Sequence, residues 1–351
     1  MAAFPSAAGQ AGSSVDQISM NADERGGAAS PGLFMPAARI GPSLLEFAPA
    51  IILLLIVVAD SARYAGTDLW WHVSSGQALL SGGRLEAHDP YSYSAPGHLR
   101  LVHEWLSEVV MAALYNALGA AGLKLWKFAC TAATILFLAA AEDETDAPLT
   151  VRITVLAAAS LALLPQMQFR PQMFTWVLMA ALIAGLARDN YRHLAPLWLC
   201  VPGVALWANL HGGFFIGLVT LAVYTASTAA QDLAAGRGLR RGFTLSAITV
   251  MSLLATLLNP FGIGTWRIVA HSLSNPMTHK VMADWRPMLV VLAEQLHQPK
   301  AGVFLMVCVL AIIAGLAVTV AVRPRGNDLA LVAVAAVMAV AAFICGRQKV
   351  A

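Results

Sequence analysis

The chain has 351 residues, of which 58% are hydrophobic and 12% are charged, and its mean hydropathy is +0.69. A soluble domain carries about 25% charged residues, so this composition excludes an ordinary soluble enzyme and indicates a polytopic membrane protein. The formal net charge of +3 offers no basic surface for nucleic acid. The four cysteines lie in apolar runs at irregular spacing, which predicts small buried residues and neither disulfides nor a metal site.

The N-terminal segment, residues 1–42, is rich in Ala, Gly, Ser and Pro and has few large apolar side chains. Because such a segment cannot bury a core, it is predicted to be a disordered tail, and residues 43–351 are predicted to form the membrane domain. The first apolar run, about residues 44–59, is interpreted as a retained transmembrane helix. A signal peptide is the alternative, because small residues follow the run, but the long tail before it has no compact basic region.

Further apolar runs predict an all-α fold with about ten transmembrane helices in total. After the first, these runs cover about residues 105–121, 123–140, 150–167, 172–187, 194–209, 213–229, 243–259, 302–322 and 328–345. Two long connections, residues 60–103 and 260–300, are predicted to be outer loops. The second contains an amphipathic piece, Thr265–His271, that is expected at the membrane interface.

The first outer loop contains the stretch Gly66–Gly83, which is predicted to form an amphipathic helix on the membrane surface. Its two stripes would hold Leu69, Trp70, Val73 and Leu80 on the apolar side and Asp68, His72 and Ser75 on the polar side. Gly82 and Gly83 would end the helix. A turn at Asp89-Pro90 and a short extended piece through Tyr93 are expected after it.

Arginines in short loops predict which ends of the helices face the cytoplasm. By alternation, one face carries Arg188 and Arg192, then Arg237, Arg240 and Arg241, then Arg323 and Arg325. Arg170, His211 and the loop from Asn259 then lie on the outer face. Asp68 shares that face with Arg170 if one of the runs 105–121 and 123–140 is interfacial or re-entrant, and lies opposite if both span the membrane.

Polar residues at the ends of apolar helices cost free energy, so they mark candidate functional positions. The outer-face candidates are Asp68 with His72, Asp89, His103 with Glu104, Arg170 among Gln166, Gln168 and Gln172, Asn209 with His211, Asn259, and Trp285. The structural alternatives are an N-cap for Asp68, a turn for Asp89, helix ends for His211 and Asn259, an interface anchor for Trp285 and a snorkelling side chain for Arg170.

No ligand spacing supports a metal site built from His72, His103 and His211 with Asp68 and Glu104. No metal or other cofactor is therefore predicted, although a divalent metal stays open.

These positions suggest a chemistry. A carboxylate at the water interface, such as Asp68, suits a general base for an acceptor hydroxyl or amine. The guanidinium of Arg170 suits the phosphate leaving group of a lipid-linked donor. The rings of Trp70 and Trp71 suit sugar faces and lipid headgroups. The set predicts glycosyl transfer from a polyprenyl-phosphate sugar.

The layout resembles the multi-span glycosyltransferases of the C-type (GT-C) fold, which include protein O-mannosyltransferases and lipid A aminoarabinose transferases. More specifically, six motifs resemble a set seen together in uncharacterised bacterial membrane proteins that are often labelled glycosyltransferase-like. These are Asp68–His72, Asp89–Tyr93, His103–Leu106, Arg170–Gln172, Asn209–Gly213 and Asn259–Gly262.

The resemblance covers about residues 43–287 and implies that Asp68 is the catalytic acid–base carboxylate and that Glu104 supports it. It also implies that the protein lies in the bacterial cytoplasmic membrane and acts outside it, with a lipid-linked sugar as donor and a glycan, lipid or protein as acceptor. Two alternative functions stay open: a non-catalytic membrane subunit that works with polysaccharide-assembly partners, and a transporter or flippase. Against a transporter, the sequence shows no repeated halves.

Overall fold

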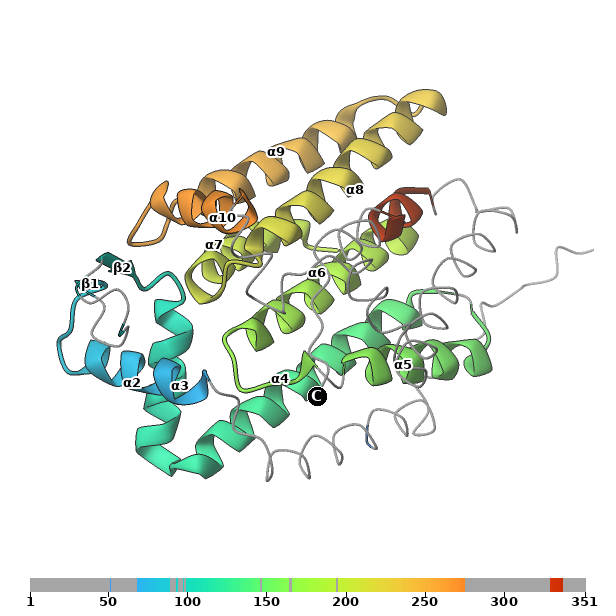
Figure 1. Cartoon of the computed structure of the whole chain (residues 1–351). Helices are drawn as coiled ribbons and strands as arrows, with labels where there is room; N and C mark the ends of the chain where they lie inside the picture. The colour runs from blue at the N-terminus through green and yellow to red at the C-terminus, as the bar shows by residue number, and fades with distance from the viewer. Residues whose placement is uncertain are drawn as a thin grey trace, which may run out of the picture. The chain divides into compact units, whose positions relative to one another are not determined.

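The computed structural model describes residues 68–88, 99–145, 147–163, 166–193, 195–274 and 329–336, together with Ile51, Tyr93 and Gly97. The chain divides into the units Met1–Gly41 and Pro42–Ala351, and all described residues belong to the second. The described part is mostly helical, as predicted (Figure 1). The predicted tail, the predicted span at 302–322 and nearly all of the one at 44–59 lie outside the described residues, as do Asp89 and Trp285.

The helices and strands follow one another along the chain. They are α2 (Leu69–Leu80), β1 (Glu86–His88), β2 (Leu99–Leu101), α3 (Trp105–Leu118), α4 (Ala120–Asp143), α5 (Leu149–Leu163), α6 (Gln172–Arg192), the 3-10 turn η2 (Leu197–Leu199), α7 (Cys200–Leu210), α8 (Phe214–Ala234), α9 (Arg240–Ala255) and α10 (Gly264–Ser274). Residues 329–336 form one more short helix.

Among the described residues, α4 and α8 are the two helices that are long and apolar enough to cross a membrane. They have 24 and 21 residues, and a rise of about 1.5 Å per residue makes each at least as long as the roughly 30 Å hydrocarbon core. Helix α3 has 14 residues and reaches only about 21 Å at that rise. The run 105–121 is therefore too short, as a helix, to span a bilayer.

Helix α2 packs against α3, and Gly76 sets how closely they approach. A Cβ on Gly76 would lie 2.0 Å from the carbonyl oxygen of Glu108, so only glycine fits there. This crossing corrects the predicted stripes of α2. His72 and Ser75, expected on the water side, are buried against α3, whereas Trp70 and Leu80 are exposed.

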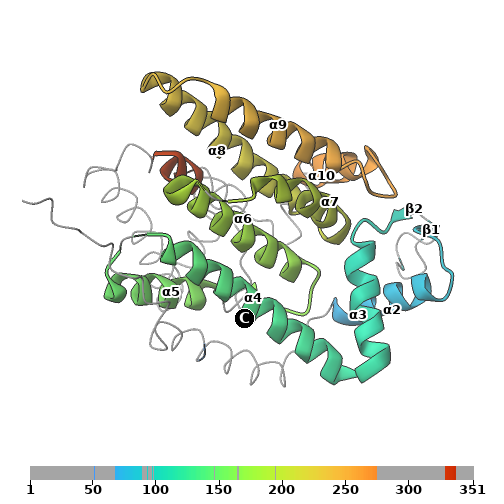
Figure 2. The ribbon, with the colours of Figure 1, turned by 180° about the vertical axis from the view of Figure 1, so that it is seen from behind.

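Two hydrophobic clusters form the core. The first lies among α2 to α6 and includes Met111 of α3, Trp126 of α4 and Met173 of α6, and α4 packs against α6. The second lies among α6 to α10 and includes Trp207 and Tyr224. Figure 2 shows α8 and α9 side by side from behind, in agreement with their contacts.

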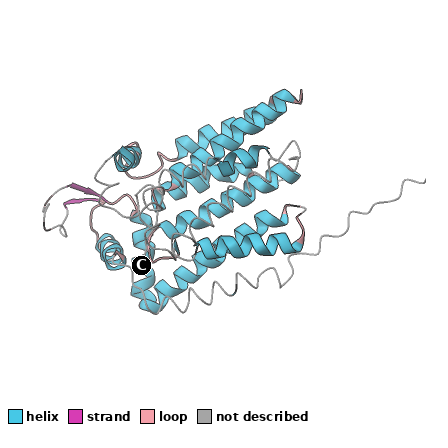
Figure 3. Ribbon diagram, turned by 45° about the vertical axis from the view of Figure 1, so that its right-hand side comes forward, coloured by secondary structure: helices cyan, strands magenta, loops and turns pink. Residues whose placement is uncertain are grey.

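The segment predicted to be the first outer loop contains a short antiparallel ribbon, which was not predicted. Strand β1 pairs with β2 in the register Glu86 to Leu101, Ala87 to Arg100 and His88 to Leu99. Figure 3 shows this ribbon as the one strand pair in the described part of the chain. Three residues per strand carry too short a pattern for a sequence to reveal.

Candidate functional site

Asp68 and Arg170 form an ion pair between Oδ2 and Nη2. Asp68 stands at the N-cap position of α2, but its side chain makes no capping hydrogen bond. Arg170 lies just before α6 and its side chain is 12% exposed, so it is not extended into solvent as a snorkelling side chain would be. The pair brings Asp68 and Arg170 together at one site, as the prediction of a shared membrane face requires.

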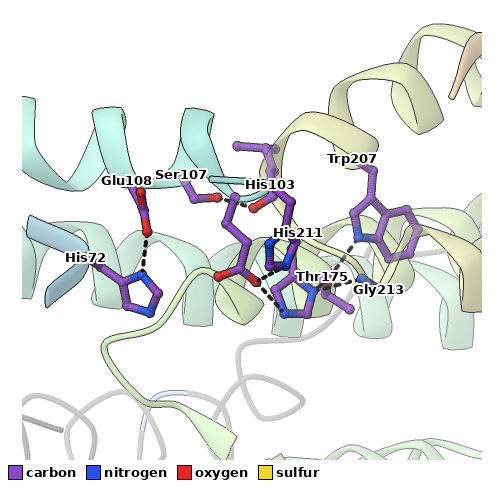
Figure 4. Close-up of polar contacts among 10 residues, drawn as sticks. His72, His103, Ser107, Glu108, Thr175, Trp207, His211 and Gly213 are labelled. Atoms are coloured by element: carbon purple, nitrogen blue, oxygen red, sulfur yellow. Dashed lines mark hydrogen bonds and ion pairs between the residues drawn. The ribbon is translucent and has the colours of Figure 1, made fainter. Parts of the chain in front are cut away.

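A second pair joins the start of α3 to the end of α7. His211 Nε2 lies 3.2 Å from Glu104 Oε1, and His103 Nε2 is farther from the same oxygen, at 3.9 Å. The other ring nitrogen of His211 accepts a hydrogen bond from the backbone of Gly213 at 2.9 Å and lies 2.8 Å from Thr175 Oγ1. Figure 4 shows His211 between the α3 residues and Thr175.

A third pair lies one turn further along α3. His72 Nδ1 is 3.1 Å from Glu108 Oε1, and both side chains are almost fully buried (Figure 4). Helix α3 thus carries two glutamates on one face, Glu104 and Glu108, and each pairs with a histidine from another element. His72 was predicted to face the substrate; the structure instead buries it between α2 and α3, where burial makes pairing with Glu108 obligatory.

The N-termini of four helices meet at these pairs. Asp68 and Glu104 are the N-cap residues of α2 and α3, and Pro171 and Gly213 are those of α6 and α8. The contacts Asp68–Arg170, Glu104–His211 and Thr175–His211 join these ends. A helix N-terminus carries a partial positive charge, so their convergence favours anions.

Asn209, near the end of α7, and Asn259, between α9 and α10, make hydrogen bonds that stabilise the loops near the site. The amide of Asn209 accepts a hydrogen bond from Trp105 Nε1 at 3.0 Å and donates to the carbonyls of Ala205 and Leu258. Asn259 Oδ1 accepts from Phe261 N and Thr265 Oγ1, both at 2.8 Å. Both amides hold the protein's own groups, which favours the structural interpretation of these two residues over a substrate contact.

The tryptophans of α2 face outward. Trp70 is 51% and Trp71 42% exposed. Trp70 stands edge-on to Tyr115 of α3, with 5.5 Å between ring centroids. These rings are accessible to a headgroup or a sugar face, as the prediction requires.

Sequence reasoning missed two residues at this site. Thr175, one turn into α6, looks like any hydroxyl in an apolar helix and gives no sequence signal. Lys127 is almost fully buried in α4, with Nζ 4.9 Å from the centroid of the Phe169 ring, next to Arg170. A lysine within an apolar run is a signal in itself, because burying its charge in a membrane segment is costly.

The C-terminal end of α6 lies against the start of α9. Arg241 at the start of α9 donates to Asp189 Oδ2 near the end of α6 at 2.7 Å, and Tyr224 donates to the same oxygen at 2.8 Å. Burial opposes the charge of Arg241, but its hydrogen bond and charge interaction with Asp189 outweigh this, so the pKa of the guanidinium is raised. Arg323 and Arg325 lie outside the described residues.

Among the described residues, no group of three or more His, Cys, Asp or Glu side chains is arranged to hold a metal ion. Comparison of the chain with protein-family models, with curated proteins and with solved structures found no match.

Proposed function

We propose that this protein is a polytopic glycosyltransferase of the bacterial cytoplasmic membrane. It moves a sugar from a polyprenyl-phosphate donor to a glycan, lipid or protein acceptor at the outer face. The observation that carries this proposal is the ion pair of Asp68 with Arg170 beside the Glu104–His211 pair. A base, a phosphate-binding cation and a second carboxylate then stand at one end of the helices.

A membrane location is supported by the outward surface of the helices. Large apolar side chains stand exposed along α4, from Leu125 to Phe137, and along α9, from Phe243 to Leu254. Soluble proteins rarely expose so many large apolar side chains, whereas a lipid-facing helix requires them. The nine predicted spans other than the run 105–121, including those in the undescribed segments, are part of this proposal.

The reaction assigns one role to each member of the first pair. The guanidinium of Arg170 binds the donor phosphate, and Asp68 thereby exchanges an arginine partner for the acceptor hydroxyl or amine. That group attacks the anomeric carbon as its proton passes to the Asp68 carboxylate. The bond between the anomeric carbon and the phosphate oxygen breaks, and the polyprenyl phosphate leaves with the electron pair.

The surroundings of the pair favour this chemistry. The converging helix N-termini stabilise the negative charge that grows on the leaving phosphate. The exposed rings of Trp70 and Trp71 provide faces for the sugar or the lipid headgroup. Asp68 has a side chain that is 39% exposed, so an acceptor can reach it.

The test uses the full chain in lipid nanodiscs with radiolabelled undecaprenyl-phosphate glucose and mannose as donors. Lipid and glycan extracts from the host serve as acceptors, and transferred label is measured. Asp68→Asn is expected to lower transfer by about a hundredfold or more, as loss of a general base does. The matched control is Asp143→Asn, because Asp143 pairs with Arg152 at 2.9 Å at the end of α4, away from the site.

Full transfer by Asp68→Asn would overturn the proposal. The alternatives give different results. A non-catalytic subunit would bind the donor through Arg170 and release no label to any acceptor. A transporter would move the labelled donor across the bilayer without breaking its sugar–phosphate bond.

A further inference from the structure

Two groups around His211 can only donate hydrogen bonds, and they fix the direction of the other hydrogen bonds in the network. Trp207 Nε1 can only donate, and its acceptor is Thr175 Oγ1 at 2.8 Å. The backbone N–H of Gly213 can also only donate, and its acceptor is His211 Nδ1 at 2.9 Å. A hydrogen on Nδ1 would point at another hydrogen, so Nδ1 carries none.

The bare Nδ1 of His211 fixes the remaining hydrogen positions in the network. The hydroxyl hydrogen of Thr175 goes to His211 Nδ1, 2.8 Å away. A neutral imidazole then carries its hydrogen on Nε2. Since Nε2 lies 3.2 Å from Glu104 Oε1, the ring donates to this carboxylate. Trp207, Thr175, His211 and Glu104 thus form one directed series of hydrogen bonds, seen in part in Figure 4.

The side chains of this series fit only because glycine occupies positions 213 and 217. A Cβ on Gly213 would lie 2.6 Å from Thr175 Oγ1 and 3.0 Å from His211 Nδ1. A Cβ on Gly217 would lie 2.4 Å from the Trp207 ring, which is fully buried in the second hydrophobic cluster. Gly212, between His211 and Gly213, has nothing within 4 Å of such a Cβ.

We propose that Trp207, Thr175 and His211 are positioning residues that hold Glu104 as an ionised carboxylate for binding the acceptor substrate. The neutral imidazole leaves one net negative charge on the Glu104–His211 pair. That charge accepts a hydrogen bond from the hydroxyl or ammonium group of the acceptor and repels the donor phosphate, which binds Arg170. Glu104 thereby selects the acceptor side of the site. The acceptor role rests on the proposed function, whereas the ring tautomer does not.

The tautomer is tested by ¹⁵N NMR of the full chain labelled at histidine, in nanodiscs at a pH of about 8, above the ordinary histidine pKa of about 6.5. His211→Gln identifies the signal by its loss. A ring with a bare Nδ1 and a hydrogen on Nε2 is expected. An Nδ1–H tautomer or an imidazolium at His211 would overturn the proposal, whether or not transfer is observed.

The acceptor role is tested by kinetics with the labelled undecaprenyl-phosphate sugars as donors and the host lipid and glycan extract as acceptor, with the acceptor KM expressed as the half-saturating mass of extract. Thr175→Val is expected to raise the KM for the acceptor about tenfold, as loss of a partner that orients a functional side chain does. The KM for the donor should stay unchanged, and Thr175→Ser should restore the acceptor KM. Equal acceptor KM values in wild type and Thr175→Val would overturn this role while leaving the proposed function standing.

A pair of glycine variants covers the case in which Thr175→Val fails to fold. Gly213→Ala is expected to disturb the His211 signal and raise the acceptor KM, whereas Gly212→Ala should change neither. If the Gly213→Ala protein folds and both its His211 signal and its acceptor KM are unchanged, the proposed series of hydrogen bonds from Trp207 to Glu104 is contradicted.

Discussion

The carboxylate of Asp68, at the start of α2, pairs with the guanidinium of Arg170, which lies just before α6. The two residues are separated along the chain by α3, α4 and α5. Of these helices only α4 is long enough to cross the hydrocarbon core, since α3 has 14 residues and α5 has 15. The proposed shared face of Asp68 and Arg170 therefore requires the whole predicted run 150–167 to return the chain across the membrane.

The proposed outer-face location of the site predicts which residues a membrane-impermeant thiol reagent can reach. In a chain whose native cysteines are replaced, Asp68→Cys and His211→Cys are expected to react from the outside of intact cells. Arg237→Cys, at a position with a half-exposed side chain near the start of α9, should react only after the membrane is permeabilised. Opposite labelling at positions 68 and 211 would contradict the assembled site and favour the scaffold or transporter functions.

The close contact at Gly76 predicts that adding one methyl group there lowers the stability of the protein. Gly76→Ala places a Cβ against the Glu108 backbone and is expected to lower the free energy of unfolding by about 1–3 kcal/mol. Gly203→Ala on α7 is the matched control, because nothing lies within 4 Å of its Cβ. There the expected change is an increase of about 0.5–1 kcal/mol, since alanine favours a helix. Unfolding in detergent micelles measures both, and equal effects would argue against the α2–α3 crossing.

The buried His72–Glu108 pair predicts non-additive mutations. His72→Leu alone leaves Glu108 buried without this partner and is expected to cost about 3–5 kcal/mol. The double variant with Glu108→Leu should cost less than the sum of the two single variants, because it removes both polar groups together. A double-mutant cycle on the free energy of unfolding measures the coupling. Additive effects would mean that the two side chains do not interact.

The network at the arginine-rich end predicts a loss of stability without loss of chemistry. Tyr224→Phe removes the hydroxyl that donates to Asp189 and is expected to lower the free energy of unfolding by about 0.5–1.5 kcal/mol. Sugar transfer should not change, because this network joins α6, α8 and α9 at the ends away from the site. A drop in transfer with stability intact would instead assign this network to the site.

The sequence predicted the helical fold and most of the candidate site for a physical reason. Asp68, Glu104, Arg170 and His211 are polar groups at the ends of apolar helices, and such groups are too costly there to be incidental. Their pairing could not be predicted, because each contact joins residues far apart along the chain. The single-sequence pattern leaves the crossing count open, because the runs 105–121 and 123–140 are both apolar.

The stripes of α2 and the role of Thr175 show where the pattern fails. The polarity of His72 suggested that it faces water. Because Gly76 has no side chain, α2 can approach α3 closely, and this approach buries His72 against Glu108. In the sequence, a glycine that permits such a close helix approach cannot be distinguished from any other glycine. Thr175 is recognisable only through its partners, Trp207 and His211, which other helices supply.

The four helix N-termini that meet at the site also determine its charge balance. Each contributes roughly half a positive charge, about +2 in all, and the C-terminal end of α7 at His211 contributes about half a negative charge. Arg170 and the neighbouring Lys127 add two positive charges, whereas Asp68, Glu104 and Glu108 remove three. The site is left with an excess of about half a positive charge. Under the proposed function, the donor is a phosphodiester with a single negative charge, which keeps the site within about half a charge of neutrality. A free phosphate monoester, with up to two negative charges, would overshoot it.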